Sequence, residues 1–227
     1  QYERLGWNTK PNESEEDTKL RSTILSLTLY GEAPDAIETA KKIYTDTANL
    51  DSIEAELRPL IISTVVRYGD ESIVDELLSE YASSQSGELR QDISVGITST
   101  RIPEKIDQLL DAIKNSDIVR PQDATRWFIY LIRGKESRTK AWRWIRDNWS
   151  WVMDTFSGDK SYDYFPQYSA SALSTAQQLQ EYVDFFEPKK EITALTRVIS
   201  IGISEIEGRV ELIKRDGTAV CEKLYDL

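Results

Sequence analysis

The chain has 227 residues, of which 40% are hydrophobic and 10% aromatic, enough to bury the core of one large domain or two small ones. Acidic residues outnumber Lys and Arg by 39 to 28, and the net charge of -11 disfavours a general nucleic-acid binder, because an acidic surface repels phosphate. With no histidine and only Cys221, the sequence excludes Ser-His-Asp and Cys-His catalysis, His-based zinc sites, thiolate clusters and an intrachain disulfide.

The first predicted helix begins after Ser14. This serine precedes three acidic residues, which favour the positive end of a helix dipole. Leu20, Ile24 and Leu27 then recur at helical spacing, and Gly31 is a stop signal. We therefore expect a capped helix from Ser14 to about Gly31.

Two prolines mark the next helix starts, because proline in a first turn costs no backbone hydrogen bond. Pro34 opens a helix in residues 33–46, and Pro59 opens another that stops at Gly69. Asp70 can then cap a helix in residues 71–83. Its apolar residues fall on one stripe: Ile73, Val74, Leu77, Leu78 and Tyr81.

The rest of the chain also has helical periodicity. Hairpin-bounded alternation is absent, so we predict an all-α protein. The isolated Gly202 and Gly208 make the last helix less certain to be continuous. The remaining helical segments cover residues 87–100, 103–115, 120–134, 135–156, 165–174, 175–187 and 188–216.

Helix breaks recur at Gly69, Thr100 and Gly134, at separations of 31 and 34 residues. This spacing is close to the period of helical-pair repeats, in which each pair buries its apolar stripe against its neighbours. We predict an α-α superhelix of stacked antiparallel helix pairs, a HEAT/armadillo-like solenoid, formed by one repeat domain over residues 1–227.

Tryptophans are concentrated in residues 142–151. Trp142 and Trp149 are seven apart, as are Trp144 and Trp151, so each pair falls on one stripe of a single helix. They could form an aromatic surface for a partner, but we expect core packing, because indoles dominate buried area.

A candidate binding pair lies at the start of the helix in residues 120–134. Gln122 and Arg126 are four apart and share one helix face, where an amide and a guanidinium could hold a peptide carbonyl or carboxylate. The alternative is a local role, in which Asp123 favours the helix dipole and Arg126 covers surface with its aliphatic stem.

Several motifs together resemble the C-terminal helical domain of aminopeptidase-N-type zinc metallopeptidases, the group of the puromycin-sensitive and endoplasmic-reticulum aminopeptidases. They occur in the order of that family and cover nearly the whole chain. The motifs are RLGW at Arg4–Trp7, VVRYGDES at Val65–Ser72, RPQDATRW at Arg120–Trp127, AWRWIRDNW at Ala141–Trp149 and LQEYVDFFE at Leu179–Glu187.

The resemblance implies that a β-rich domain and a thermolysin-like domain precede this one, and that the thermolysin-like domain holds zinc through H-E-x-x-H and a downstream Glu. This chain would then be a C-terminal fragment of a larger aminopeptidase, with no catalytic or metal-ligating residue of its own and no activity alone. It would enclose the active site and shape a peptide cavity, with Gln122 and Arg126 as substrate-binding residues.

The expected partners are therefore a peptide substrate and the upstream catalytic domain, not nucleic acid or a membrane. No apolar run approaches the roughly 20 residues that cross a bilayer, and the lone Cys221 favours a reducing, cytoplasmic location. A freestanding HEAT-like protein-interaction scaffold stays open as the alternative.

Overall fold

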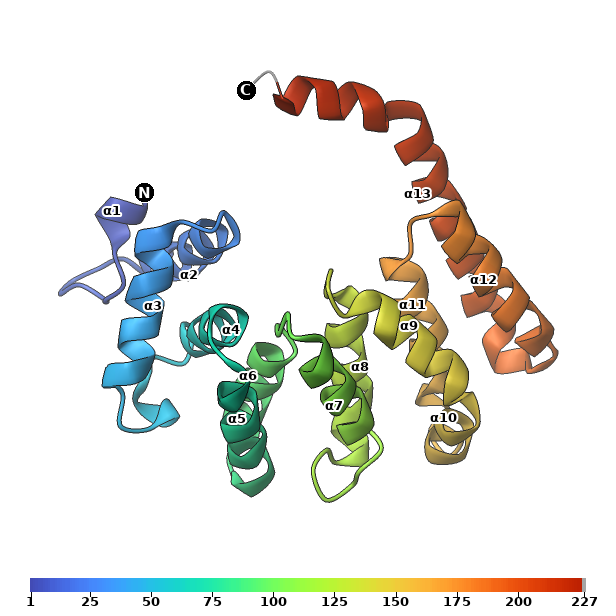
Figure 1. Cartoon of the computed structure of the whole chain (residues 1–227), viewed down its shortest axis with the longest axis horizontal. Helices are drawn as coiled ribbons and strands as arrows, with labels where there is room; N and C mark the ends of the chain where they lie inside the picture. Colours follow the sequence, from blue (N-terminus) through green and yellow to red (C-terminus); the bar gives the residue numbers. More distant parts are fainter. Residues whose placement is uncertain (226–227) are drawn as a thin grey trace. The chain divides into compact units, whose positions relative to one another are not determined.

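The computed structural model describes residues 1–225, and this part of the chain is all-α, without a strand (Figure 1). The predicted fold class is confirmed. The helices are α1 (Tyr2–Leu5), α2 (Glu15–Tyr30), α3 (Pro34–Asp46), η1 (Leu50–Ser52), α4 (Arg58–Tyr68), α5 (Glu71–Ser83), α6 (Gly87–Ile97), α7 (Pro103–Ala112), α8 (Pro121–Arg133), α9 (Arg138–Asp147), α10 (Trp149–Phe156), η2 (Ser161–Asp163), α11 (Tyr164–Ala172), α12 (Ala176–Phe186), η3 (Glu187–Glu191) and α13 (Thr193–Tyr225).

The chain folds into two compact units, Gln1–Val119 and Arg120–Leu227. Each unit has its own core. The prediction of one repeat domain over residues 1–227 stays a prediction.

The predicted helix starts in the first unit are confirmed by their caps. The Ser14 hydroxyl accepts a hydrogen bond from the backbone N–H of Asp17 at 3.1 Å and begins α2. The Asp70 carboxylate accepts from the backbone N–H of Ser72 at 2.9 Å and begins α5. Each cap satisfies a backbone donor that the helix itself leaves without a partner.

In the first unit, α4 packs between α3 and α6, and α5 packs on α6. Gly96 allows α4 and α6 to approach closely, because a Cβ at that position would stand 2.1 Å from Cγ2 of Ile62. Buried Arg58 ties the same helices together. Its guanidinium donates to the Asp92 carboxylate at 2.7 Å and to the backbone oxygen of Leu50 at 2.9 Å. Burial is the main reason that the pKa of Asp92 is raised, although Arg58 favours its charged form.

In the second unit, α11 packs against both α8 and α13, and α12 packs on α13. The core between these helices is aromatic, with Trp127, Phe128, Phe165, Tyr182 and Phe186 fully buried. Phe128 and Phe165 join α8 to α11 with ring centroids 4.9 Å apart. Aromatic side chains of this size supply much of the buried apolar area.

The second unit differs from the sequence prediction in two places. Residues 135–156 form two helices, because Asn148 leaves helical geometry and its side-chain N–H donates to the backbone oxygen of Trp144 at 2.8 Å. The last predicted segment, residues 188–216, is one helix through Gly202 and Gly208, but α13 begins later, at Thr193, and continues to Tyr225. Packing of its first half outweighs the poor helix propensity of glycine there.

Candidate functional site

The start of α8 is organised by an ion pair one turn long. Arg120 is the residue before the helix, and its guanidinium donates from Nε to the Asp123 carboxylate at 2.9 Å and from Nη2 at 2.8 Å. Pro121 occupies the first helical position. The ion pair holds the Arg120 side chain beside Asp123 in the first turn of α8.

Gln122 and Arg126 lie on the exposed face of this helix. Both side chains are exposed, whereas the opposite face of α8 buries Ala124, Trp127 and Phe128 against the core. An amide and a guanidinium one helical turn apart therefore lie together on the exposed face of α8. That they bind a peptide stays a prediction.

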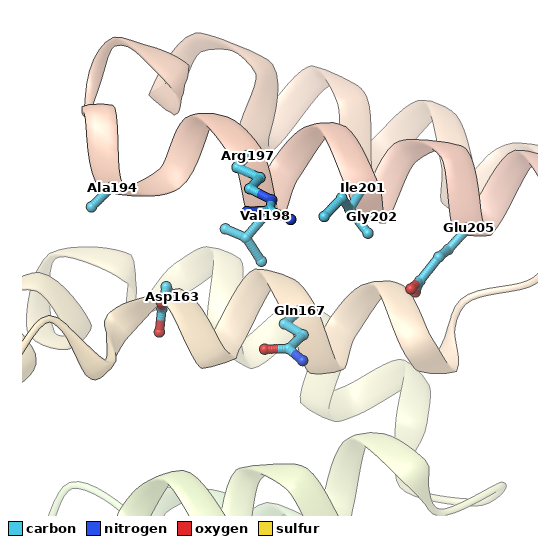
Figure 2. Close-up of a pocket in the computed structure, with 8 residues that line it drawn as sticks. All are labelled: Asp163, Gln167, Ala194, Arg197, Val198, Ile201, Gly202 and Glu205. Carbon is cyan, nitrogen blue, oxygen red and sulfur yellow. The ribbon is translucent and has the colours of Figure 1, made fainter.

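A pocket of about 370 Å³ opens between α11 and α13 (Figure 2). Neither Gln122 nor Arg126 is among its lining residues. It is lined by Asp163, Gln167, Ala194, Arg197, Val198, Ile201, Gly202 and Glu205.

The α13 side of the pocket carries the apolar lining and a cation. Figure 2 shows Arg197 and Val198 on α13 above Asp163 and Gln167, with Glu205 further along the same helix. The Arg197 guanidinium can bind a small anionic group, and the carboxylates of Asp163 and Glu205 can bind a small cationic group. The sequence analysis missed this pocket, because its residues come together only when α13 crosses α11.

Helix α13 packs tightly against its neighbours at Gly202, which also lines the pocket. A Cβ at this position would stand 2.4 Å from the Tyr182 hydroxyl oxygen and 2.9 Å from Cβ of Ala170. Glycine at position 202 therefore allows a close approach between α13 and its neighbours.

The predicted core position holds for the first two tryptophans of the segment, whereas Trp149 and Trp151 are half-buried. Trp142 and Trp144 are buried. The Trp142 indole N–H donates to the Glu181 carboxylate at 2.8 Å, and Arg146 lies over the same indole with its Cζ 4.9 Å from the ring centroid. The indole hydrogen bond is the main reason that the pKa of Glu181 lies below its ordinary value.

Lys189 is a partly buried cation that the sequence analysis did not single out. Its Nζ lies 3.6 Å from the Phe185 ring centroid and 5.8 Å from that of Trp149. It also donates to the backbone oxygen of Phe185 at 2.6 Å. Burial lowers the pKa of Lys189, and the ring faces compensate part of the lost hydration.

Within residues 1–225, no three His, Cys, Asp or Glu side chains are grouped so that they could hold a metal ion. These residues therefore do not fit a catalytic zinc, which takes three protein ligands. Over the same range, no helix combines the length and apolarity needed to cross a bilayer.

Comparison with known proteins gives consistent matches over this chain. The family model for the ERAP1-like C-terminal domain matches residues 1–208. Aminopeptidase N of Lactobacillus helveticus is 35% identical over 222 residues, covering 97% of this chain and 26% of its own length. Aminopeptidase N of Lactococcus lactis subsp. cremoris is 37% identical over 229 residues, covering 100% of this chain and 27% of its own length.

A more distant match is Aminopeptidase A of Gloydius brevicauda, which is 23% identical over 180 residues and covers 77% of this chain. The chain thus spans 26 to 27% of the length of the two bacterial relatives, and it corresponds to their C-terminal part.

Proposed function

The chain belongs to the ERAP1-like C-terminal domain family, and on that premise we propose that it is the non-catalytic C-terminal domain of an aminopeptidase that removes N-terminal residues from peptides. The observation that carries this proposal is the alignment of nearly the whole chain with the C-terminal quarter of bacterial proteins named Aminopeptidase N. The catalytic chemistry then belongs to the polypeptide that precedes residue 1.

We assign the zinc of such an enzyme to that preceding part. Zinc would supply a Lewis acid and an activated water there. The residues of this chain would contribute by binding and orienting the peptide and by excluding water, not by ligating the metal. The absence of histidine from the sequence supports this division of labour.

The proposed role in substrate binding falls on Gln122 and Arg126. Both are exposed on α8, at the end where Arg120 and Asp123 fix the helix. The Arg126 guanidinium can donate to a peptide carboxylate or carbonyl oxygen, and the Gln122 amide can both donate and accept hydrogen bonds. Contacts remote from the cleaved bond hold a peptide in the reactive orientation and thereby raise kcat/KM.

We further propose that the domain encloses the active site and limits the peptides that fit. A helical cover over a catalytic centre excludes water, and its opening and closing can control substrate entry and product release. A cytoplasmic location belongs to the same proposal. Its support is the single cysteine, Cys221, which is an exposed thiol on α13.

The test is the reading frame and activity of the complete gene product. We expect an H-E-x-x-H motif upstream of residue 1, zinc-dependent hydrolysis of aminoacyl-nitroanilides by the complete protein, and no hydrolysis by residues 1–227 alone. Turnover by residues 1–227 would refute the non-catalytic assignment. A reading frame without the upstream motif would instead favour a freestanding helical scaffold that binds a protein partner.

A further inference from the structure

The apolar stripe of α13 continues beyond the part of the helix that packs on α11 and α12 of the same unit. In the first half, Leu195, Ile199, Gly202 and Ile206 recur every three or four residues and are buried. The same spacing continues through Ile213, Gly217, Val220 and Leu224. Residues at this spacing share one face of a helix. Arg209 occupies the position between Ile206 and Ile213 on this face, so the helix carries two apolar stretches separated by one arginine, and only the first stretch is buried.

Coverage by the second unit ends at Arg209. Its guanidinium donates from Nε to the backbone oxygen of Leu173 at 2.9 Å and also to that of Ala170, at the C-terminal end of α11. Beyond this point, Ile213 is 54% exposed, Val220 53% and Leu224 63%. Figure 1 shows the end of α13 extending past α11 and α12.

The exposed half presents a shallow apolar depression. It has a volume of about 410 Å³ and is lined by Asp216, Ala219, Val220, Lys223 and Leu224. Its centre is aliphatic, and its edge has one acid and one base. This is the pattern of a helix face that docks into an apolar surface with a charged rim.

A second copy of the chain is a poor occupant for this face. The exposed stripe runs from Ile213 to Leu224, which is less than two heptads. Self-paired coiled coils need about three to four heptads of continuous apolar positions. A short stripe is sufficient only when its partner is tethered nearby, because a tether raises the effective concentration to the millimolar range.

We propose that the stripe Ile213, Gly217, Val220 and Leu224 docks on an apolar surface of the polypeptide that precedes residue 1 in the longer protein. This inference rests on the proposed function, since it requires that longer protein. The relatives provide the length for such a partner, because this chain spans only 26 to 27% of them. Docking there would bury Ile213, Val220 and Leu224, which the rest of the second unit leaves exposed.

The test is hydrogen exchange in the complete protein. We expect slow amide exchange across residues 213–224. In the double variant Val220→Glu/Leu224→Glu, exchange there should be faster by about tenfold or more, because each large aliphatic side chain loses its buried environment. Exchange at residues 195–206 should stay slow and so report that the second unit still folds.

Thr218→Glu is the matched control. Thr218 is exposed and β-branched like Val220, two positions away, and therefore on the opposite side of the helix. It receives the same charge, and exchange over residues 213–224 should match that of the parent protein. An equal acceleration in both variants would overturn the proposal, as would fast exchange in the parent protein.

The outcomes separate this inference from its premise. Protection that disappears on dilution would assign the face to a second copy and overturn the proposal. If the complete protein has no aminopeptidase activity but exchanges slowly at residues 213–224, the proposed activity is refuted and the docking face stands. A gene with no polypeptide before residue 1 would overturn both.

Discussion

The hydroxyl oxygen of Tyr182 lies 2.4 Å from the position that a Cβ on Gly202 would occupy. The same hydroxyl donates to the backbone oxygen of Pro166 at 3.1 Å and is buried between α11, α12 and α13. Tyr182 therefore cannot move aside without losing its hydrogen bond, and α13 cannot carry a side chain at position 202 without moving away.

Gly202→Ala should destabilise the second unit. Forcing a methyl group against Tyr182 and Ala170 costs roughly 1–3 kcal/mol of unfolding free energy, and alanine gains about 1 kcal/mol in helix propensity, so we expect a net loss of up to about 2 kcal/mol. Urea unfolding followed by circular dichroism measures the change.

Gly208→Ala is the control on the same helix. No atom lies within 4 Å of a Cβ built there, so only the propensity term remains. We expect a gain of about 0.5–1 kcal/mol. If both glycine variants shifted stability in the same direction, the close approach at Gly202 would not be what requires glycine.

Thr175→Ala should destabilise α12 by about 1 kcal/mol, because it removes one half of a capping box. The Thr175 hydroxyl accepts from the backbone N–H of Gln178 at 3.2 Å, and the Gln178 amide oxygen accepts from the backbone N–H of Thr175 at 3.1 Å. Thr175→Ser keeps the hydroxyl and should be close to the parent protein in thermal unfolding. A serine variant as unstable as the alanine variant would argue against the cap.

Glu181 should contribute to stability above its ordinary pKa of 4.5 and lose that contribution in acid. Its pKa is lower in the folded state, chiefly because the Trp142 indole N–H donates to the carboxylate. The unfolded chain therefore takes up the proton first as pH falls, and unfolding becomes easier until pH drops below the folded pKa.

The variant Glu181→Gln keeps an acceptor for Trp142 but no longer titrates. Its unfolding free energy should fall less steeply than that of the parent protein as the pH falls through 4.5, the ordinary pKa of glutamate. Trp142→Phe should flatten the same slope by removing the donor, while lowering stability at all pH values. Identical acid slopes in the parent protein and Glu181→Gln would contradict this assignment.

Arg126→Ala in the complete protein should lower kcat/KM for longer peptides by about tenfold, the loss expected for one charge-assisted hydrogen bond. Gln122→Ala should show a smaller loss in the same direction. Hydrolysis of an aminoacyl-nitroanilide, which has no peptide chain beyond the cleaved bond, should be unchanged. Steady-state kinetics over a series of peptide lengths makes the comparison.

Arg143→Ala is the matched control for this series. Arg143 is also an exposed arginine of the second unit, on α9. Its removal alters net charge equally but should leave the length dependence intact. Equal effects of both arginine variants would assign the loss to charge, and no effect of either would remove Arg126 from the binding surface.

Local signals predicted most of the helix boundaries. Ser14 and Asp70 cap the helices that they were expected to cap, and Pro34 and Pro59 lie in first turns. Each of these signals acts within one helical turn, so the neighbouring residues contain all the information needed. Burial of Trp142 followed as well, because large aromatic side chains at helical spacing favour a core position.

Features that depend on packing were not predictable in the same way. The break at Asn148 depends on a hydrogen bond back to Trp144, which competes with helix propensity by a small margin. The need for glycine at position 202 depends on Tyr182, twenty residues earlier. The pocket between α11 and α13 depends on how two helices cross, and no local motif specifies that crossing.

The hydrogen bonds of Arg209 to the end of α11 also influence the direction in which the rest of α13 extends. The sixteen residues beyond Arg209 extend about 24 Å at the ordinary rise of an α-helix. A tilt of the helix axis by about ten degrees at Arg209 therefore moves the helix end by about 4 Å. Substitution of Arg209 would therefore change the direction of the helix axis beyond this residue far more than its helicity.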